Sequence, residues 1–425
     1  MNGEELTKEL KERGLIAQEG GGTLEEILGK KRKVYLGVDP TADSIHVGNL
    51  VPIILMKHLF DNGHEPFLLV GGATGLIGDP KDTGERPFSD PEVVDRNAES
   101  IKEQLSRLLK KDKLVVFNNA DWLGKVKLID FLRDIGKHFS VNQLIKRDII
   151  KRRLETEESS ISYTEFSYSL LQGYDYMHLN ESHEIDLQIG GSDQWANIIS
   201  GVDLVRRKKG KDVYAITTPI ITDKATGKKL GKSEGNATWL DPEKTSPFVF
   251  YQFWINVSDE DVEEYLKVFS FLLLDEIGEL MRRHAEAPHE RVAQRKLAES
   301  VTEFVHGSEV KRSVEKVSRI LYGGDLESVF PISDEDREMI LKEVPNFIAE
   351  ADDVKKGIPV IDALVKTGLV TSKAQARRAV EGGGVSVNGK RIDKNLLIGE
   401  SHFKEKIILI KKGKKMAVLS THFEG

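Results

Sequence analysis

In the segment 35–49, the side chains best suited to take part in chemistry are His46 and Asn49, which are three positions apart. The segment begins as an apolar strand, breaks at a glycine and then becomes helical. Residues three apart share a helix face, and a strand leading into a helix N-terminus points free backbone N–H groups at one spot. We therefore expect a phosphate-binding position here, with Asp43 or Ser44 as the helix cap. The alternative is an ordinary capped strand–turn–helix unit.

A second group of reactive side chains is cationic. Lys228, Lys229 and Lys232 lie in the loop 222–233, which follows an expected strand. The loop resembles a P-loop, but that motif needs four residues between its glycines and this loop has three, so we reject that interpretation. Lysines on a flexible loop can clamp phosphates as point charges. An exposed basic hairpin tip is the alternative.

Tyr168, Gln172 and Asp175 form a polar stripe, because spacings of four and seven residues place all three on one helix face. Such a stripe is either a wet surface or the wall of a polar pocket, and position alone favours the surface. Two glycine-rich loops, at residues 71–80 and 190–195, follow expected strands and carry further polar groups. A loop of this kind can hold a ligand close to its backbone.

The first 240 residues alternate between strand and helix patterns. Apolar or alternating runs predict strands at 34–36, 67–70, 114–117, 183–189 and 213–221. This alternation predicts an α/β, Rossmann-like domain, in which a parallel sheet has its ligand site at the carboxyl ends of the strands. The glycine spacing after the second strand does not match the dinucleotide fingerprint, so a nicotinamide cofactor is disfavoured.

Composition sets the outer limits. A chain of 425 residues predicts two or three domains, and 39% hydrophobic with 31% charged residues describes a soluble globular protein. The absence of cysteine excludes disulfides and thiolate catalysis, and we expect no protein metal site. No apolar run approaches the ~20 residues that span a membrane, and no signal-peptide segment is present, so we expect a cytoplasmic protein without membrane partners.

The charge is unevenly distributed. Residues 355–425 carry 15 Lys/Arg and 6 Asp/Glu, an excess of nine positive charges, which leaves −16 for residues 1–354. Within the basic segment, two expected helices precede a strand that ends in Asn388-Gly389, a strong hairpin signal. A basic module on an acidic body predicts a polyanionic partner. A solvated lysine-rich surface is the alternative.

These motifs resemble the class I aminoacyl-tRNA synthetases. The two signature motifs correspond to His46-Val47-Gly48-Asn49 and Lys229-Leu230-Gly231-Lys232-Ser233, and residues 35–44, 71–80, 191–195 and 251–256 narrow the resemblance to the bacterial-type tyrosyl-tRNA synthetases. The similarity covers essentially the whole chain. Three residues depart from the family pattern: Asn49 replaces the second histidine, while Leu230 and Gly231 replace methionine and serine. Asparagine retains a hydrogen-bond donor, and glycine should make the loop more mobile.

The resemblance implies a two-step reaction. The tyrosine carboxylate attacks the α-phosphate of ATP, giving tyrosyl-adenylate and pyrophosphate, and tyrosine then passes to the 3′-terminal ribose of tRNA(Tyr). No protein nucleophile is required, so the lack of cysteine is no obstacle. Positioning and matched donors must stabilise the growing phosphate charge. Mg²⁺ is expected with the nucleotide, held by its phosphates more than by protein ligands.

The resemblance also assigns residues. The catalytic group is His46, Asn49, Thr41, Lys229 and Lys232. Contacts to ATP or the adenylate are assigned to Gly37, Asp39, Asp193, Gln194 and Lys232. Tyr35 and Asp175 would bind the substrate phenol. Asp79, Tyr168 and Gln172 would bind its ammonium group, and Arg86 would join the ATP contacts from its own loop.

By resemblance, residues 1–240 form the catalytic domain, 241–322 a helical anticodon-binding domain, 323–356 a linker with one short helix, and 357–425 a small α+β RNA-binding domain. Lys373, Arg377 and Arg378 would contact tRNA there, so the affinity should fall steeply with salt. The family is homodimeric.

Two alternatives remain. A tryptophanyl enzyme shares the chemistry, although Tyr35 and Asp175 favour a phenol. An RNA-binding protein that lost catalysis is opposed by the intact His46 and Lys232.

Overall fold

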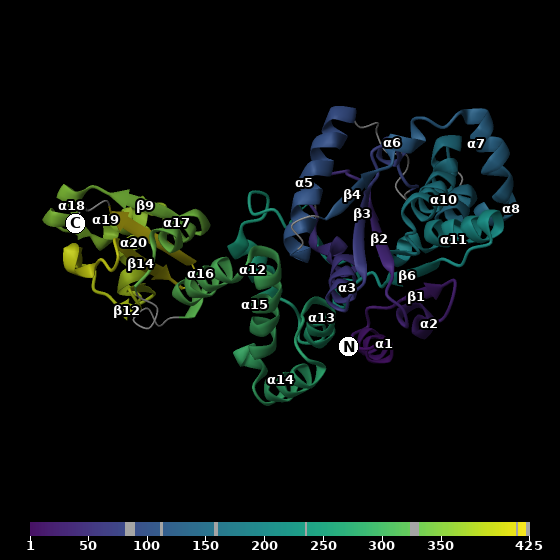
Figure 1. The fold of residues 1–425 in the computed structure, drawn as a ribbon. Coiled ribbons are helices and arrows are strands. Elements are labelled where there is room, and N and C mark those ends of the chain that lie inside the picture. The colour runs from purple at the N-terminus through teal and green to yellow at the C-terminus, as the bar shows by residue number, and fades with distance from the viewer. Residues whose placement is uncertain are drawn as a thin grey trace. The chain divides into compact units, whose positions relative to one another are not determined.

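A computed structural model describes residues 1–80, 90–110, 114–156, 160–233, 236–323, 331–413 and 415–421. The chain divides into two compact units, one comprising Met1–Thr245 with Phe253–Val301 and the other Ser246–Gln252 with Thr302–Gly425. Figure 1 labels their helices and strands. Over the described ranges, no helix has both the length and the apolar character needed to cross a bilayer.

The first unit is built on a six-stranded sheet. Its strands lie in the order β1 (Gln18–Gly20), β6 (Tyr214–Thr218), β5 (Leu187–Gly191), β2 (Lys33–Val38), β3 (Glu65–Val70) and β4 (Val115–Asn118). All neighbouring pairs are parallel except β1 with β6, which are antiparallel. The expected Rossmann-like parallel sheet is therefore present, with one antiparallel edge strand that the apolar pattern did not indicate.

Helices cover both faces of this sheet. Helices α3 (Leu50–Asp61) and α5 (Pro91–Leu109) lie on one face, and α10 (Tyr163–His183) and α11 (Trp195–Lys209) lie on the other (Figure 1). On the α10 side, Tyr35, Phe67 and Leu69 of the sheet are buried in one core with residues of α10 and α11. The apolar strands thus bury both faces, as parallel strands normally do.

The helix after β2 begins later than the sequence indicated. A 3₁₀ turn η1 (Val47–Asn49) precedes α3, and the His46 side chain caps it by accepting a hydrogen bond from the Gly48 N–H at 3.0 Å. The expectation that Asp43 or Ser44 caps this helix is wrong. Both side chains have other partners: Asp43 pairs with Lys244 at 2.6 Å, and the Ser44 hydroxyl donates to a backbone carbonyl.

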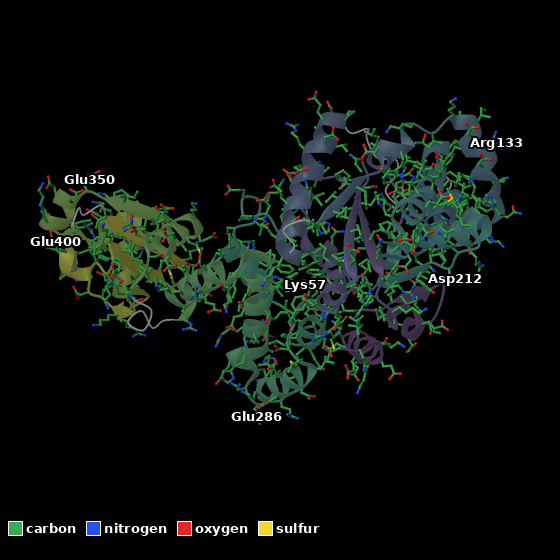
Figure 2. All side chains as sticks on the ribbon, in the orientation of Figure 1. Lys57, Arg133, Asp212, Glu286, Glu350 and Glu400 are labelled. Carbon is green, nitrogen blue, oxygen red and sulfur yellow. The ribbon has the colours of Figure 1, made fainter. Side chains whose placement is uncertain are left out.

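The remaining helices of this region are short. They are α1 (Gly3–Glu12), α2 (Leu24–Leu28), α4 (Thr74–Ile77), α6 (Ala120–Leu123), α7 (Leu128–Asp134), α8 (Val141–Leu144) and α9 (Asp148–Glu155). Charged side chains project from the surface of several of these elements, as Arg133 does on α7 (Figure 2). The caps of α1 and α2 are local: Asn2 and Thr23 each accept from a backbone N–H three residues on.

Helices dominate from residue 240 to about residue 322, as the sequence indicated. The signature loop contains the two-stranded pair β7 (Lys232–Ser233) and β8 (Asn236–Ala237). It is followed by α12 (Pro247–Ile255), α13 (Val262–Phe269), α14 (Leu274–Glu286), α15 (Val292–His306) and α16 (Ser308–Ser318). Large aromatic side chains such as Trp254, Tyr265 and Phe269 are fully buried here, so tertiary packing stabilises this helical region.

The second unit contains a five-stranded sheet in the order β12 (Lys390–Arg391), β11 (Val385–Val387), β14 (Ile407–Lys412), β15 (Lys415–Thr421) and β9 (Asn346–Ala349). A smaller sheet pairs β10 (Ile358–Pro359) with β13 (Leu397–Ile398). Besides α16, its helices include α17 (Asp334–Glu343), α18 (Ala351–Lys356), α19 (Val360–Lys366) and α20 (Lys373–Glu381). The expected Asn388-Gly389 hairpin joins β11 to β12.

One segment of this unit differs from expectation. Residues 346–349, assigned from the sequence to a linker, form β9, which pairs in parallel with β15 from Asn346↔Val418 to Ala349↔Thr421. A four-residue strand has little pattern of its own, and its partner lies about seventy residues away, so the local sequence does not reveal the pairing. The last part of the expected linker is therefore built into the C-terminal sheet.

Candidate active site

The carboxyl ends of β2 and β5 border a cavity of about 360 Å³. These strands are neighbours, yet the chain continues from β2 towards one sheet edge and from β5 towards the other. Such a switch point is where open α/β sheets bind ligands. Of the residues assigned above, those lining the cavity are Gly37, Asp39, Thr41, His46, Asn49, Asp79, Tyr168, Gln172, Asp175, Asp193, Gln194 and Lys229.

Tyr35 is placed differently. It does not line the cavity and is fully buried, with its ring edge-on to Tyr176 at 5.3 Å between centroids. Burial raises the pKa of the Tyr35 phenol, and the charges of Tyr176 and Asp175 add to the rise. Its hydroxyl has no hydrogen-bond partner among the described residues. An unpaired buried hydroxyl is costly, so this atom is suited to a polar ligand.

Asp175 projects from α10 and is almost fully buried. Its carboxylate accepts from Asn119 Nδ2 at 2.9 Å and from Trp122 Nε1 at 2.7 Å. Burial raises the pKa of Asp175 to about 7, although the two donors oppose that rise. Sequence reasoning missed both donors. Asn119 directly follows β4, and its place at a strand's carboxyl end was the available signal.

A hydrogen-bonded network extends from these donors along the cavity wall. Asn119 Nδ2 also donates to Thr74 Oγ1 at 2.9 Å, and Thr74 donates to Asp39 Oδ1 at 2.9 Å. The other Asp39 oxygen accepts from the Tyr168 hydroxyl at 2.8 Å. A β-carbon at Gly71 would lie only 2.0 Å from Asp39 Oδ1, so the network requires glycine there.

Asp79 is a second carboxylate of this cavity whose pKa is raised. It accepts from Gln194 Nε2 at 2.7 Å and from Asn197 Nδ2 at 3.1 Å. Burial raises the pKa of Asp79 to about 6, against the effect of the two amide donors. The charges of Asp39 and Asp193 add to the rise. The sequence analysis did not identify Asn197, which lies one helical turn after Gln194.

The first signature motif packs against the second and against the segment 238–239 that follows it. Val47 N–H donates to Thr238 O at 2.9 Å, and the His46 ring lies edge-on to Trp239 at 5.9 Å. Gly231 has φ +76°, a left-handed conformation that favours glycine, and a β-carbon there would come within 3.2 Å of the Gly48 nitrogen. The departure from serine at this position therefore fits the local backbone.

Two assigned residues lie partly or wholly outside the described part of the structure. Lys232 lies in β7, but its side chain is outside the described part of the structure. Arg86 lies in the segment 81–89, also outside the described residues.

The candidate RNA contacts lie in the second unit. Lys373, Arg377 and Arg378 are exposed on α20, whose Ala376 and Val380 are buried. Lys373 is paired with Asp362 at 2.6 Å. Of these three cations, Arg377 and Arg378 are therefore the more available for contacts with RNA phosphates.

Comparisons with known proteins identify the family. The family model described as tRNA synthetases class I (W and Y) matches residues 29–323, and the model of the tyrosine–tRNA ligase SYY-like C-terminal domain matches residues 336–419. A tyrosine–tRNA ligase of Streptococcus pneumoniae (strain ATCC 700669 / Spain 23F-1) is 46% identical over 427 residues, covering 97% of this chain and 99% of the relative. The chain belongs to the class I tyrosyl-tRNA synthetases. The resemblance inferred from the sequence is confirmed, and the tryptophanyl alternative is not supported.

Solved structures agree with this family. A C-terminally truncated mitochondrial tyrosyl-tRNA synthetase of Aspergillus nidulans is 31% identical, covers 75% of this chain and 94% of its own, and gives a TM-score of 0.66. The corresponding enzyme of Coccidioides posadasii is 32% identical, with coverages of 73% and 91% and a TM-score of 0.64. The synthetase fold predicted for the catalytic region is confirmed.

Proposed function

We propose that the cavity binds tyrosine beside ATP, and that this tyrosine–tRNA ligase forms tyrosyl-adenylate there before transferring tyrosine to tRNA(Tyr). The observation that carries the proposal is the placement of two carboxylates in the cavity that His46 and Lys229 also line: Asp175, which is buried, and Asp79, which is half-buried. Each accepts hydrogen bonds from neutral donors. A polar amino acid with an ammonium group and a phenol supplies a partner for each carboxylate.

The phenol is assigned to the end of the cavity that holds Asp175. Its O–H would donate to the Asp175 carboxylate, and its oxygen would accept from the Tyr35 hydroxyl, which has no partner among the described residues. Phenylalanine has no such oxygen, so it would leave the Tyr35 hydroxyl without a partner and deprive the Asp175 carboxylate of the phenol donor, and a site of this kind rejects it strongly. The ammonium group is assigned to Asp79, with Tyr168 and Gln172 beside it.

The nucleotide is assigned to the part of the cavity near the first signature motif. Thr41, His46 and Asn49 would contact its phosphates and ribose, and Gly37, Asp39, Asp193 and Gln194 the nucleotide or the adenylate. Lys229 and Lys232 would close over the pyrophosphate as a lid, with Arg86 from its own loop. Mg²⁺ arrives with ATP, and when bound it neutralises charge on the phosphates. The chain's own residues orient the attacking carboxylate and bind the leaving pyrophosphate.

We also propose that residues 1–240 carry out catalysis and that residues 241–322 bind the anticodon. Within residues 357–425, Lys373, Arg377 and Arg378 would bind RNA. The segment 323–356 remains the proposed connection, although its strand β9 belongs to the C-terminal sheet. A cytoplasmic location is proposed because translation uses this reaction there.

A homodimer is proposed as the working assembly. Large apolar side chains are exposed on α7, α8, α9 and the start of α10, where Leu128, Ile129, Val141, Leu154 and Tyr163 are each between 56% and 72% exposed. Exposed large apolar side chains are a common feature of protein interfaces. Light scattering coupled to gel filtration would give twice the chain mass of 47.7 kDa, and a mass of one chain at micromolar concentration would refute the dimer.

The decisive experiment is tyrosine-dependent ATP–pyrophosphate exchange with purified protein. The parent should exchange with tyrosine and not with tryptophan, and absence of exchange would favour the RNA-binding protein without catalysis. Asp175→Ala should lose discrimination against phenylalanine far more than it loses ATP affinity. Equal discrimination in variant and parent would remove Asp175 from the phenol subsite.

A further inference from the structure

Arg147 lies between α8 and α9, and its guanidinium has a set of neutral partners. One terminal nitrogen, Nη1, donates to Asn197 Oδ1 at 3.0 Å and to the Ser169 hydroxyl. The other, Nη2, donates to the Ala196 carbonyl at 3.0 Å and to Ser200 Oγ at 2.5 Å. A half-buried arginine is thus anchored on α10, which carries three of the proposed tyrosine contacts, and on α11, which carries Asn197.

The contact to Asn197 determines which way that amide points. Asn197 is 7% exposed, and its oxygen accepts from Arg147 and from Ser169 Oγ, the latter at 2.9 Å. Because guanidinium groups only donate, the amide oxygen must face Arg147 and the NH₂ must face the other way. That NH₂ donates to Asp79 Oδ1 at 3.1 Å and to Gln194 Oε1 at 3.2 Å.

Gln194 continues the same directional chain. Its oxygen is occupied by Asn197, so its own NH₂ is left to donate to the second Asp79 oxygen, Oδ2, at 2.7 Å. Both oxygens of the Asp79 carboxylate therefore accept from amide N–H groups. Arg147 fixes the orientation of the Asn197 amide, and Asn197 in turn fixes that of the Gln194 amide. Arg147 itself makes these hydrogen bonds to neutral groups, and Asn197 stands between it and the Asp79 carboxylate.

We propose that Arg147 is a positioning residue for the amino-acid ammonium subsite, acting on Asp79 through Asn197 and Gln194. This inference rests on the proposed function, since it takes Asp79 as the ammonium partner. Loss of the guanidinium frees the Asn197 amide to rotate, and a rotated amide presents its oxygen to the carboxylate. Asp79 then loses one charge-assisted hydrogen bond and its alignment towards the cavity.

The size of the effect follows from that single bond. A hydrogen bond to a charged group is worth about 10- to 100-fold in an equilibrium constant. Tyrosine affinity should fall by about that factor. A ligand that lacks the ammonium group does not use Asp79, so its affinity should change by less than about twofold.

The arginine also packs three segments together, so a purely structural role is the competing explanation. Arg147 lines a second cavity of about 340 Å³, and neither Asn197 nor Asp79 is among the residues that line it. Replacement by a shorter apolar chain therefore has room and exposes the freed polar groups to water. A structural role predicts that every ligand is weakened together with the stability of the fold.

The experiment compares two ligands in the full-length enzyme. Arg147→Met is measured with L-tyrosine and with 3-(4-hydroxyphenyl)propionate, which keeps the phenol and carboxylate but lacks the ammonium group. The propionate is used as a competitive inhibitor of tyrosine-dependent exchange. The expected result is a loss of about 10- to 100-fold for tyrosine and an unchanged inhibition constant for the propionate. Equal losses for both ligands, or no loss for tyrosine, would overturn the proposal.

A matched control is available on α11. Arg207 lines the same second cavity and donates to the His138 carbonyl at 2.8 Å, without contact to Asn197. Arg207→Met should leave both constants unchanged. Arg147→Lys keeps the charge but loses the two terminal nitrogens of the planar guanidinium, so it should lower the affinity for tyrosine by an intermediate factor. It replaces Arg147→Met in the test if the methionine variant fails to fold.

Coupling to Asp79 separates this inference from the proposed function. In an Asp79→Asn background, Arg147→Met should cost no further tyrosine affinity, because the carboxylate through which it acts is gone. If Asp79→Asn binds tyrosine as tightly as the parent, the ammonium assignment itself fails. If Asp79→Asn lowers the affinity for tyrosine and Arg147→Met does not, or if the two losses of affinity simply add, the proposed role of Arg147 is refuted and the ammonium assignment stands.

Discussion

Replacing Trp122 by phenylalanine should shift the pH at which this enzyme distinguishes tyrosine from phenylalanine. The indole N–H donates to Asp175 Oδ1 at 2.7 Å, while the ring stacks on His178 at 4.4 Å between centroids. Phenylalanine keeps an aromatic ring in that stack and removes only the donor. The substitution therefore isolates one hydrogen bond to the carboxylate of the proposed phenol subsite.

The size of the shift follows from the strength of that bond. A hydrogen bond to an ionised group is worth about 2 kcal/mol, and one pKa unit corresponds to about 1.36 kcal/mol. Burial has already raised the pKa of Asp175 to about 7. Loss of the Trp122 donor should raise it to about 8.5. At pH 7.5 the ionised fraction then falls from about three-quarters to about one-tenth.

The ionised fraction matters because the charge is what penalises phenylalanine. A buried carboxylate that loses the phenol donor is left poorly paired, whereas a protonated carboxyl suffers much less. Discrimination in the parent should therefore rise as the pH passes about 7, and in the variant only as it passes about 8.5. At pH 7.5 the variant should discriminate about eightfold less well, and near pH 9.5 the two should converge.

The assay is pyrophosphate exchange with each amino acid from pH 6 to 9.5, with kcat/KM ratios compared at each pH. His178→Leu is the control, since it removes the stacked ring and leaves the indole donor in place. Its discrimination profile should keep the midpoint of the parent. A common midpoint for the parent and Trp122→Phe would refute the account, because the donor would then have no influence on the ionisation that sets specificity.

Three further outcomes are expected. Lys232→Ala should slow adenylate formation in single-turnover experiments and leave tyrosine affinity near normal; an unchanged rate would exclude this lysine from the chemistry. Because burial raises the pKa values of Asp79 and Asp175 to about 6 and 7, their contribution to the stability of the ligand-free enzyme is complete below pH ~4 and is lost as the pH rises through 6 and 7. Urea unfolding should show this decline, flattened in Asp175→Ala. Joint replacement of Arg377 and Arg378 by alanine should weaken tRNA binding and lower the salt slope by about one per lost phosphate contact; an unchanged slope would place the tRNA elsewhere.

The sequence predicted the features that have a local pattern. The apolar runs that became β3 and β4 alternate with helices, and they lead to loops whose polar residues lie at strand ends. Tyr168, Gln172 and Asp175 were expected on one helix face, and they line one cavity. The surface interpretation that position alone favoured for this stripe was wrong, because a helix face says nothing about which element covers it.

Features that depend on distant partners were not predictable in this way. The donors to Asp175 come from Asn119 and Trp122, more than fifty residues earlier in the chain. The cap of the first motif is His46 rather than a preceding Asp or Ser, since those side chains are drawn to partners such as Lys244. An inventory of favourable cap residues cannot anticipate such competition, because it is decided by tertiary contacts.

The neutrality of the donors explains why the two carboxylates are both useful and costly. Asp175 is held by an amide and an indole, and Asp79 by two amides. A lysine or arginine in direct contact would lower either pKa, but it would also compete with the substrate for the same oxygens. Neutral donors align each carboxylate and leave its charge uncompensated until a ligand arrives. Substitutions that neutralise either charge should therefore stabilise the empty enzyme above pH 7 and weaken tyrosine binding, because both effects have the same electrostatic origin.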